Sequence, residues 1–338
     1  MSELTVSRHF VEAALTGARK KGVDIDSLLI RSGISPDLLK IEMARVSSSQ
    51  YSLLLQNVWN LMEDEFMGLG PRRCRTGTFA TMCALMIDCP NLEAVYRQAF
   101  DFCRLFDPMV GMQLEKQGDE VKLVTVIEGD FDDSLRFFQE SILVIWHRLG
   151  SWLIGHPAEL TRAEFSYPEP AHGDEYRHIF HCPLAFNAPH TALTFSKRFL
   201  DSPVIRDKSK MRQFLKTSPA DLLSRPDESN TYTGRIRALI GKDFSRSLPD
   251  FEWIASELNT SPQTLRRRLK QENTSFQELK DLLRRDMAIY YLSRPDLAIN
   301  DIAFKVGFTE PSTFHRAFKK WTGVTPGAYR EGERGRSA

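Results

Sequence analysis

The sequence predicts two domains of different class, an α+β domain in residues 1–215 and an all-α domain in residues 232–331. Residues 299–326 have the pattern of two short amphipathic helices around a glycine turn, which indicates a helix-turn-helix. A related pattern lies about fifty residues upstream, and a long helical stretch joins the two. In the first domain, residues 112–127 alternate apolar and polar side chains around a polar turn, which predicts a β-hairpin.

The C-terminal unit is expected to be a helix, a turn at Gly307 and a second helix. Gly307 tolerates the left-handed backbone that ends a helix, and Phe308 follows as a hydrophobic anchor. Apolar side chains form two facing stripes at helical spacing: Ile302, Ala303 and Val306, then Phe314, Phe318 and Trp321. The outward face of the second helix is basic and suits a DNA major groove. The alternative is an ordinary helical hairpin with a solvated basic face.

The upstream unit has the same order of features. Its first helix is expected to end before a turn at residues 259–261, and residues 262–270 form the second helix. The spacer helix, residues 275–293, would be about 28 Å long at 1.5 Å per residue. That length can place two recognition helices about one DNA turn apart, roughly 34 Å. One chain is therefore expected to read two successive major grooves.

These residues carry a family resemblance. The pattern Gly-Phe-x-Glu-Pro-Ser-x-Phe-x-Arg-Ala-Phe-Lys-x-Trp-x-Gly-x-Thr-Pro, complete from Gly307 to Pro326, resembles the second DNA-binding motif of AraC-type transcription regulators. The upstream ThrLeuArgArgArgLeuLys is similar to the first motif, and CysProLeuAlaPheAsnAlaPro before ThrAlaLeuThrPhe looks like the arabinose-binding-like regulatory domain. The resemblance implies an α+β N-terminal regulatory domain for effector binding and dimerisation, a linker at residues 216–231, and a double helix-turn-helix DNA-binding domain.

The positions that these residues occupy in the family's motifs imply which side chains contact DNA. Six match base-reading positions: Gln263, Arg266, Arg267, Ser312, His315 and Arg316. Glutamine is suited to adenine and arginine to guanine. Phosphate contacts are expected from eight others: Thr264, Lys270, Ser275, Arg284, Lys305, Thr309, Lys319 and Lys320. Pro311 stands where many relatives have a polar residue, so the second unit is expected to read fewer bases. The alternative for some of the arginines is contact with phosphate only.

Charge is distributed unevenly along the chain. The formal net charge of the 338 residues is only +1, yet residues 233–330 contain 17 Lys and Arg against 11 Asp and Glu. The preceding part is net acidic. Such asymmetry is typical of a nucleic-acid-binding module joined to a different kind of domain.

Composition also indicates the cellular compartment of the protein. The 5 cysteines are odd in number and scattered, which fits a reducing cytoplasm better than a disulfide scaffold. The most apolar run, residues 141–155, is too short to span a bilayer. A cytoplasmic protein without a membrane partner is therefore expected.

Other chemistry is weakly indicated. Phosphate loops, nucleophile elbows and paired acid-base motifs are missing from the sequence, so neither an enzyme nor a cofactor is expected. The spacing of His172, His178, His181 and Cys182 matches no zinc pattern. The candidates for effector binding are Arg72, Arg73 and Arg75, which can pair with an anion, and Trp146. The alternative for Trp146 is that its ring belongs to the hydrophobic core.

Two functions remain open. The first is a metabolite-responsive transcription regulator, which by family resemblance activates, dimerises through its N-terminal domain and works with RNA polymerase on double-stranded DNA. The second is a ligand-independent architectural or interaction protein that binds DNA and uses its N-terminal domain only to oligomerise.

Overall fold

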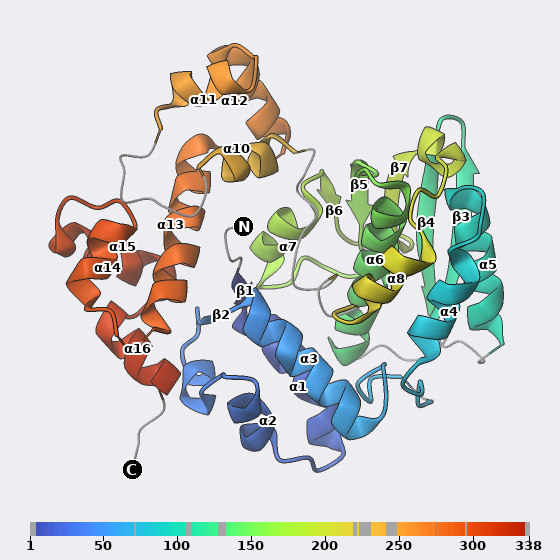
Figure 1. The fold of residues 1–338 in the computed structure, drawn as a ribbon, viewed down its shortest axis with the longest axis horizontal. Coiled ribbons are helices and arrows are strands. Elements are labelled where there is room, and N and C mark those ends of the chain that lie inside the picture. Colours follow the sequence, from blue (N-terminus) through green and yellow to red (C-terminus); the bar gives the residue numbers. More distant parts are fainter. Residues whose placement is uncertain are drawn as a thin grey trace. The chain divides into compact units, whose positions relative to one another are not determined.

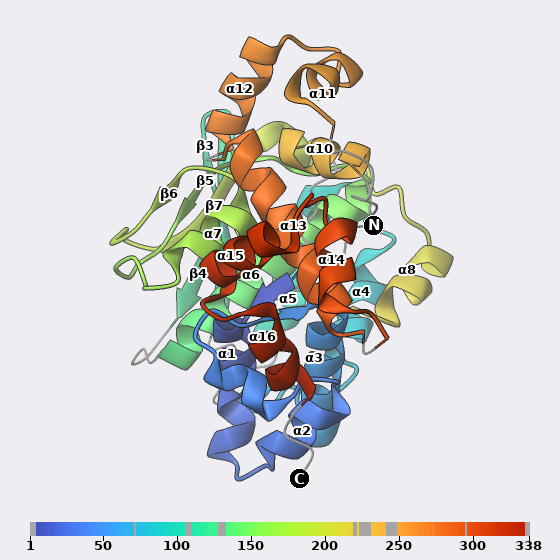
Figure 2. The same ribbon diagram turned by 90° about the vertical axis from the view of Figure 1, so that its left-hand side faces the viewer.

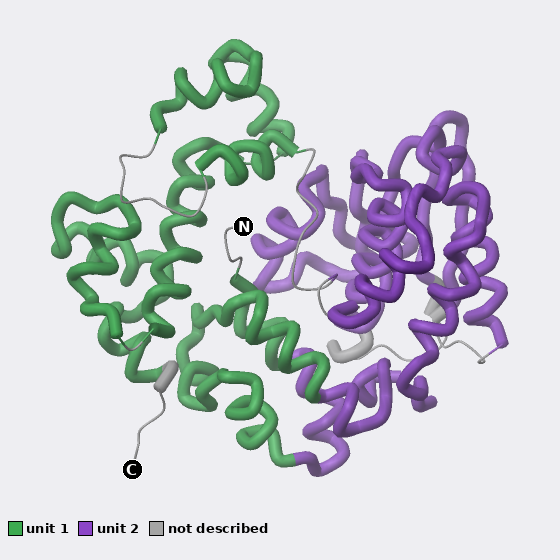
Figure 3. The backbone as a smooth tube through the Cα atoms, in the orientation of Figure 1, with its two compact units in different colours: residues 1–12, 24–57, 231–338 green, residues 13–23, 58–230 purple. Residues whose placement is uncertain are grey.

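The computed structural model describes residues 5–70, 72–105, 110–127, 133–218, 222, 231–240, 249–272, 274–294 and 296–334 (Figures 1 and 2). The chain folds as two compact units (Figure 3). Unit 1 contains residues 1–12, 24–57 and 231–338, and unit 2 contains residues 13–23 and 58–230.

The compact units differ from the sequence boundaries at the N-terminus. Residues 1–12 and 24–57 belong with the C-terminal helices in unit 1, because they contact those helices through the core of that unit. Most of the expected linker, residues 216–231, lies outside the described residues. The assignment of functional domains to residues 1–215 and 232–331 stays a prediction.

Seven helices form the described C-terminal part of unit 1, and they include the expected spacer helix and the expected pair of helices in each helix-turn-helix unit. In chain order they are α10 Tyr232–Ile240, α11 Phe251–Glu257, α12 Pro262–Gln271, α13 Phe276–Leu292, α14 Ile299–Lys305, α15 Pro311–Thr322 and α16 Pro326–Arg334. Figures 1 and 2 show α11 and α12 at one end of α13, and α14 and α15 beside its other half. The long α13 is therefore the spacer between two helix-turn-helix units.

The N-terminal part of unit 1 contains a strand pair that the sequence did not predict. Strands β1 (Thr5–Ser7) and β2 (Arg45–Ser47) pair antiparallel, with Thr5 opposite Ser47. Three-residue strands are too short for an alternating pattern to be recognised. The other elements that begin in this region are α1 Arg8–Lys20, α2 Ile25–Arg31, the 3₁₀ helix η1 Pro36–Lys40 and α3 Ser48–Met62, of which α1 and α3 continue into unit 2.

Unit 2 is built on a five-stranded sheet in the order β3-β4-β7-β5-β6. Its strands are β3 Val110–Gln117, β4 Glu120–Ile127, β5 Leu160–Glu164, β6 Leu184–Ala185 and β7 Thr191–Ser196. The expected hairpin is present as β3 and β4, with Leu114 opposite Leu123. Only β5 and β6 pair in parallel within the described sheet.

Helices cover this sheet and complete its core. They are α4 Thr78–Met86, α5 Leu92–Arg104, α6 Asp133–Ile154, α7 Gly173–Phe180 and α8 Lys208–Leu215. Helix α6 packs on β4 and β7. The sequence did not predict α7 or α8, because each buries only one or two side chains. In α7 the buried pair Tyr176 and Phe180 is spaced by one helical turn.

Candidate nucleic-acid interface

The two helix-turn-helix units have the same turn geometry at positions 48 residues apart. In the first, Asn259 has φ 51° and the N–H of Thr260 donates to the carbonyl of Ala255 at 2.9 Å. In the second, Gly307 has φ 81° and the N–H of Phe308 donates to the carbonyl of Ala303 at 3.0 Å. A left-handed residue that closes such a bond ends a helix and redirects the chain. The chain therefore folds two copies of one motif.

The first recognition helix, α12, begins at a capped N-terminus. The Ser261 hydroxyl accepts the N–H of Thr264 at 3.1 Å, and Pro262 occupies the first helical position. Leu265 and Leu269 are buried against α11. The carboxylate of Glu272 then accepts the N–H of Tyr232 at 2.7 Å, which fastens the end of α12 to α10. These contacts fix which face of α12 is exposed.

The second recognition helix, α15, is anchored by aromatic side chains. Phe314 and Phe318 are fully buried, and the Phe318 ring meets the Tyr329 ring edge-on at 5.4 Å. Helix α15 ends at Gly323, which has φ 82° and donates its N–H to the carbonyl of Lys319 at 2.9 Å. The opposite face of α15 carries the polar and basic residues.

Most of the side chains expected to contact DNA are exposed, on α12, on α15 or close to them in the chain. The exposed ones are Gln263, Arg266, Arg267, Lys270, Ser275, Lys305, Thr309, Ser312, Arg316, Lys319 and Lys320. Thr264, Arg284 and His315 are half-buried. The Arg266 guanidinium lies over the Phe251 ring at 5.0 Å, which restricts its orientation. The individual contacts with bases and phosphates stay predictions.

Two of the phosphate candidates have structural contacts of their own. Arg284 donates from Nη2 to the carbonyl of Gly307 at 3.1 Å, and its guanidinium lies over the Phe308 ring at 4.8 Å. Burial lowers the pKa of this guanidinium from its usual value. Ser275 is the N-cap of α13, where it forms a capping box with Glu278. Arg284 therefore supports the turn before α15, and Ser275 begins the spacer helix.

A brace of hydrogen bonds from the N-terminal segment holds α13 and α16, the helices before and after the second helix-turn-helix unit, and sequence reasoning missed it. The backbone N–H of Arg45 donates to the Tyr329 hydroxyl at 3.0 Å, and that hydroxyl donates to the carbonyl of Arg45 at 2.5 Å. The Thr5 hydroxyl accepts Arg45 Nε at 2.7 Å and donates to Asp286 Oδ1 at 2.6 Å. Tyr329 is fully buried, and Arg45 and Asp286 are 7% and 4% exposed. The partners are 281 and 284 residues apart, so no local pattern signals them.

The proposed effector residues lie in unit 2 and are not brought together in one described pocket. Trp146 is buried in an aromatic cluster, with its ring 5.6 Å from that of Phe100 and 6.3 Å from that of Tyr96. Arg73 is exposed and pairs with Glu63, while Arg72 and Arg75 are exposed nearby in the chain. Trp146 packs in this cluster, and effector binding by Trp146 and the three arginines stays a prediction.

One buried carboxyl group in unit 2 is electrostatically unusual. Glu140 on α6 accepts hydrogen bonds from the hydroxyl groups of Tyr167 and Tyr176. Burial raises the pKa of Glu140 to about 7, although both hydrogen bonds oppose the rise. The guanidinium of Arg136 lies 5.1 Å from the centre of the Tyr167 ring. This group ties α6 to α7 and to the chain after β5.

Comparison with known proteins decides the family. The model of the arabinose-binding domain of AraC transcription regulators matches residues 22–204, and a helix-turn-helix domain model matches residues 254–332. This chain belongs to the AraC family. It is a DNA-binding transcription regulator with an N-terminal ligand-binding domain, and the family is not enzymatic.

The chain is also similar to individual proteins. The ornithine utilization regulator of Pseudomonas aeruginosa is 27% identical over 326 residues, which cover 95% of each chain. The DNA-binding dual transcriptional regulator Rns of Escherichia coli is 36% identical over 99 residues, or 28% of this chain and 36% of Rns. The crystal structure of the transcriptional regulator CdpR from Pseudomonas aeruginosa aligns over 95% of this chain and 97% of CdpR, with 19% identity and a TM-score of 0.32.

Two further findings concern metals and membranes. Across the described ranges, no cluster of three or more His, Cys, Asp or Glu side chains is arranged to hold a metal ion. His172 instead packs its ring against Tyr176, with centroids 5.5 Å apart. None of the helices in the part of the chain that the structure describes is long and apolar enough to span a membrane.

Proposed function

We propose that this AraC-family regulator is a transcription activator that binds one DNA site with α12 and α15 and responds to a small metabolite. The observation that carries the proposal is the duplicated turn, which presents an exposed polar and basic helix face in each unit. A single α13 joins the two units, so one chain has two recognition helices for neighbouring grooves.

Each recognition helix has its own share of the proposed contacts. Gln263, Arg266 and Arg267 would read bases in one groove, and Ser312, His315 and Arg316 would read the next. The phosphate contacts proposed for the lysines on α12 and α15 would set the position of the protein on the duplex. Selection from randomised DNA tests this arrangement. Two short conserved blocks about one helical turn apart support it, and a single block contradicts it.

Salt dependence provides a second test on DNA. If about six phosphates are contacted, affinity for the selected site should fall roughly 10³-fold between 50 and 200 mM salt. Fluorescence anisotropy across that range measures the slope. A binding constant that stays flat contradicts the proposed basic faces.

The regulatory part of the proposal concerns the N-terminal domain. It would bind the metabolite and pair two copies of the chain, and the resulting dimer would recruit RNA polymerase. Because the Pseudomonas aeruginosa relative that matches 95% of this chain is named an ornithine utilization regulator, ornithine is the first metabolite to test.

Ligand-dependent unfolding measures that response. A specific ligand at 100 times its dissociation constant should stabilise the chain by about 2.7 kcal/mol. Ornithine is tested first and a broad metabolite set follows, with DNA affinity measured in parallel. If no compound stabilises the protein while DNA binding persists, the ligand-independent architectural function is favoured instead.

A further inference from the structure

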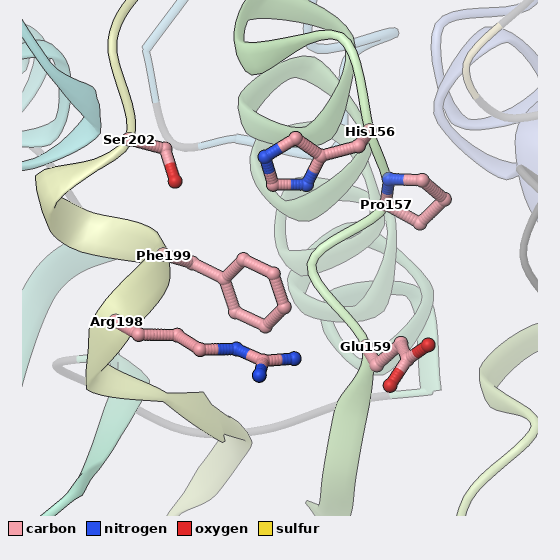
Figure 4. A pocket seen from close by; sticks show the side chains of 6 residues that line it. All are labelled: His156, Pro157, Glu159, Arg198, Phe199 and Ser202. Atoms are coloured by element: carbon pink, nitrogen blue, oxygen red, sulfur yellow. The ribbon is translucent and has the colours of Figure 1, made fainter.

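A pocket of about 390 Å³ opens in unit 2 between the turn after α6 and the 3₁₀ helix η2 (Lys197–Asp201). Its volume is within the range of small-molecule sites. Six residues line it (Figure 4): His156, Pro157, Glu159, Arg198, Phe199 and Ser202. None of them was singled out from the sequence as a functional residue.

Both walls of this pocket are held in place by hydrogen bonds. On one wall, the backbone N–H of Ala158 donates to Ser151 Oγ at 3.0 Å, and the carbonyl of Ala158 is 2.6 Å from His147 Nε2. On the other wall, the carbonyl of Ser202 accepts the N–H of Leu92 at 3.1 Å. The chain beyond it is fixed where the N–H of Ile205 donates to the carbonyl of Leu153 at 3.0 Å. These bonds fix the backbone on both sides of the pocket, which lowers the entropic cost of binding.

The two walls present opposite charges. Arg198 comes from η2 and Glu159 from the turn before β5, and Figure 4 shows the Arg198 guanidinium directed toward the Glu159 side of the pocket. Neither side chain forms an ion pair with any residue in the described part of the chain. The Arg198 guanidinium lies 4.8 Å from the centre of the Phe199 ring, which restricts its position. Each charge is thus left available for a ligand.

Polar groups lie at the other side of the Phe199 ring. The His156 ring is 5.6 Å from that of Phe199, and Figure 4 shows the imidazole and the Ser202 hydroxyl on the same side of the pocket. Both groups can form hydrogen bonds, while Phe199 and Pro157 supply apolar surface. The pocket combines a cation, an anion, two hydrogen-bonding groups and an aromatic ring.

We infer that this pocket binds a small zwitterion of the amino-acid type. The ligand carboxylate pairs with Arg198, whose planar guanidinium matches the geometry of a carboxylate, and the ligand ammonium pairs with Glu159. A simple anion meets repulsion from Glu159, and a simple cation meets repulsion from Arg198. Only a ligand with both charges satisfies the two walls together. Binding is a property of the pocket alone, but a role for this ligand as the effector rests on the proposed function.

The test uses the full-length chain and isothermal titration with the common free L-amino acids. For each amino acid that binds, its N-acetyl derivative removes the ammonium charge, and its amide removes the carboxylate charge. We expect the free amino acid to bind about tenfold more tightly than either derivative, because each derivative loses one charge-assisted hydrogen bond.

Three variants assign the charges to residues. Glu159→Gln should abolish the preference over the N-acetyl derivative, and Arg198→Ala should abolish the preference over the amide. Lys197→Ala is the matched control, since Lys197 is an exposed base beside Arg198 that does not line the pocket. It should bind like the wild type. Unchanged melting temperatures confirm that the exposed substitutions leave the fold intact.

The outcomes separate this inference from the proposed function. If no amino acid binds the wild-type chain, or if Glu159→Gln and Arg198→Ala bind with wild-type affinity and selectivity, the pocket assignment is wrong. Affinity for DNA without amino acid should be the same in all variants. Failure of the wild-type chain to select any DNA sequence contradicts the proposed function and leaves the pocket assignment standing.

Discussion

The two helix-turn-helix units have the same turn geometry but differ in the residues that support them. The first has a largely aliphatic core around Ile254 and Leu265, and its Phe251 is only half-buried. The second buries Phe314, Phe318 and Tyr329 completely. The second is also braced from outside the C-terminal helices, by residues of β1 and β2.

This difference shows that a repeated motif keeps its turn while its surroundings change. The turn is local and needs one left-handed residue and one anchor, so both copies retain it. The supporting core depends on neighbours. In the C-terminal unit the following helix, α16, buries Tyr329, which bonds Arg45 of β2. A change in the N-terminal segment therefore reaches Tyr329 and Asp286 through direct hydrogen bonds.

The largest expected effect comes from removing an aromatic anchor. Phe318→Ala should destabilise the second unit by about 3–5 kcal/mol, because a fully buried ring is replaced by a cavity. Leu265→Ala, the comparison in the first unit, should cost about 2–5 kcal/mol there. Hydrogen exchange of α12 and α15 amides measures each unit separately. If either substitution speeds hydrogen exchange in both helix-turn-helix units, their cores are not separate.

The brace itself is tested by Tyr329→Phe. The ring keeps its contact with Phe318, but the N–H and carbonyl of Arg45 lose their partner, at a cost of about 1–3 kcal/mol. Faster hydrogen exchange is expected in α16, with the first unit unchanged. Tyr290→Phe is the control, since among the described residues the Tyr290 hydroxyl bonds only Arg294, at the exposed end of α13. An equal effect from both variants shows that the brace adds no stability.

The arginine substitutions compare the units on DNA. Arg266→Ala, Arg267→Ala and Arg316→Ala should each weaken binding to the preferred site by about 1–3 kcal/mol if a base contact is lost. Loss of a phosphate contact instead weakens all sequences alike and reduces the salt slope by about one. In selections from randomised DNA, the α12 variants should lose sequence preference in one part of the site, and Arg316→Ala should lose it in another part. If all three variants lose sequence preference at the same positions, α12 and α15 do not read separate parts of the site.

The smallest expected effect is at the edge of the brace. Thr5→Val keeps the shape of the side chain but removes the hydroxyl that joins Arg45 to Asp286, which should cost about 1 kcal/mol. Ser7→Ala on the same strand is the control, because the Ser7 hydroxyl has no hydrogen-bond partner among the described residues. Urea unfolding monitored in both variants measures the difference. If Ser7→Ala loses more stability than Thr5→Val, the strand pair is stabilised by contacts other than the Thr5 hydrogen bonds.

Local features of this protein could be read from its sequence. Gly307 and Phe308 marked the second turn, and Phe314 and Phe318 marked the buried face of α15. Each of these features depends on residues a few positions apart, and backbone sterics or helical periodicity record such spacing directly in the sequence. The exposed faces of α12 and α15 followed from the same periodicity.

The tertiary structure decided what distant residues do together. Arg284, whose phosphate contact stays a prediction, bonds Gly307 and stacks on Phe308. No sequence pattern singled out Tyr329, and its two hydrogen bonds to Arg45 bridge 284 positions. Glu159 and Arg198 share a pocket only because the turn after α6 packs beside η2. Contacts of this kind leave no periodic pattern, because the fold rather than the local chain determines which side chains meet.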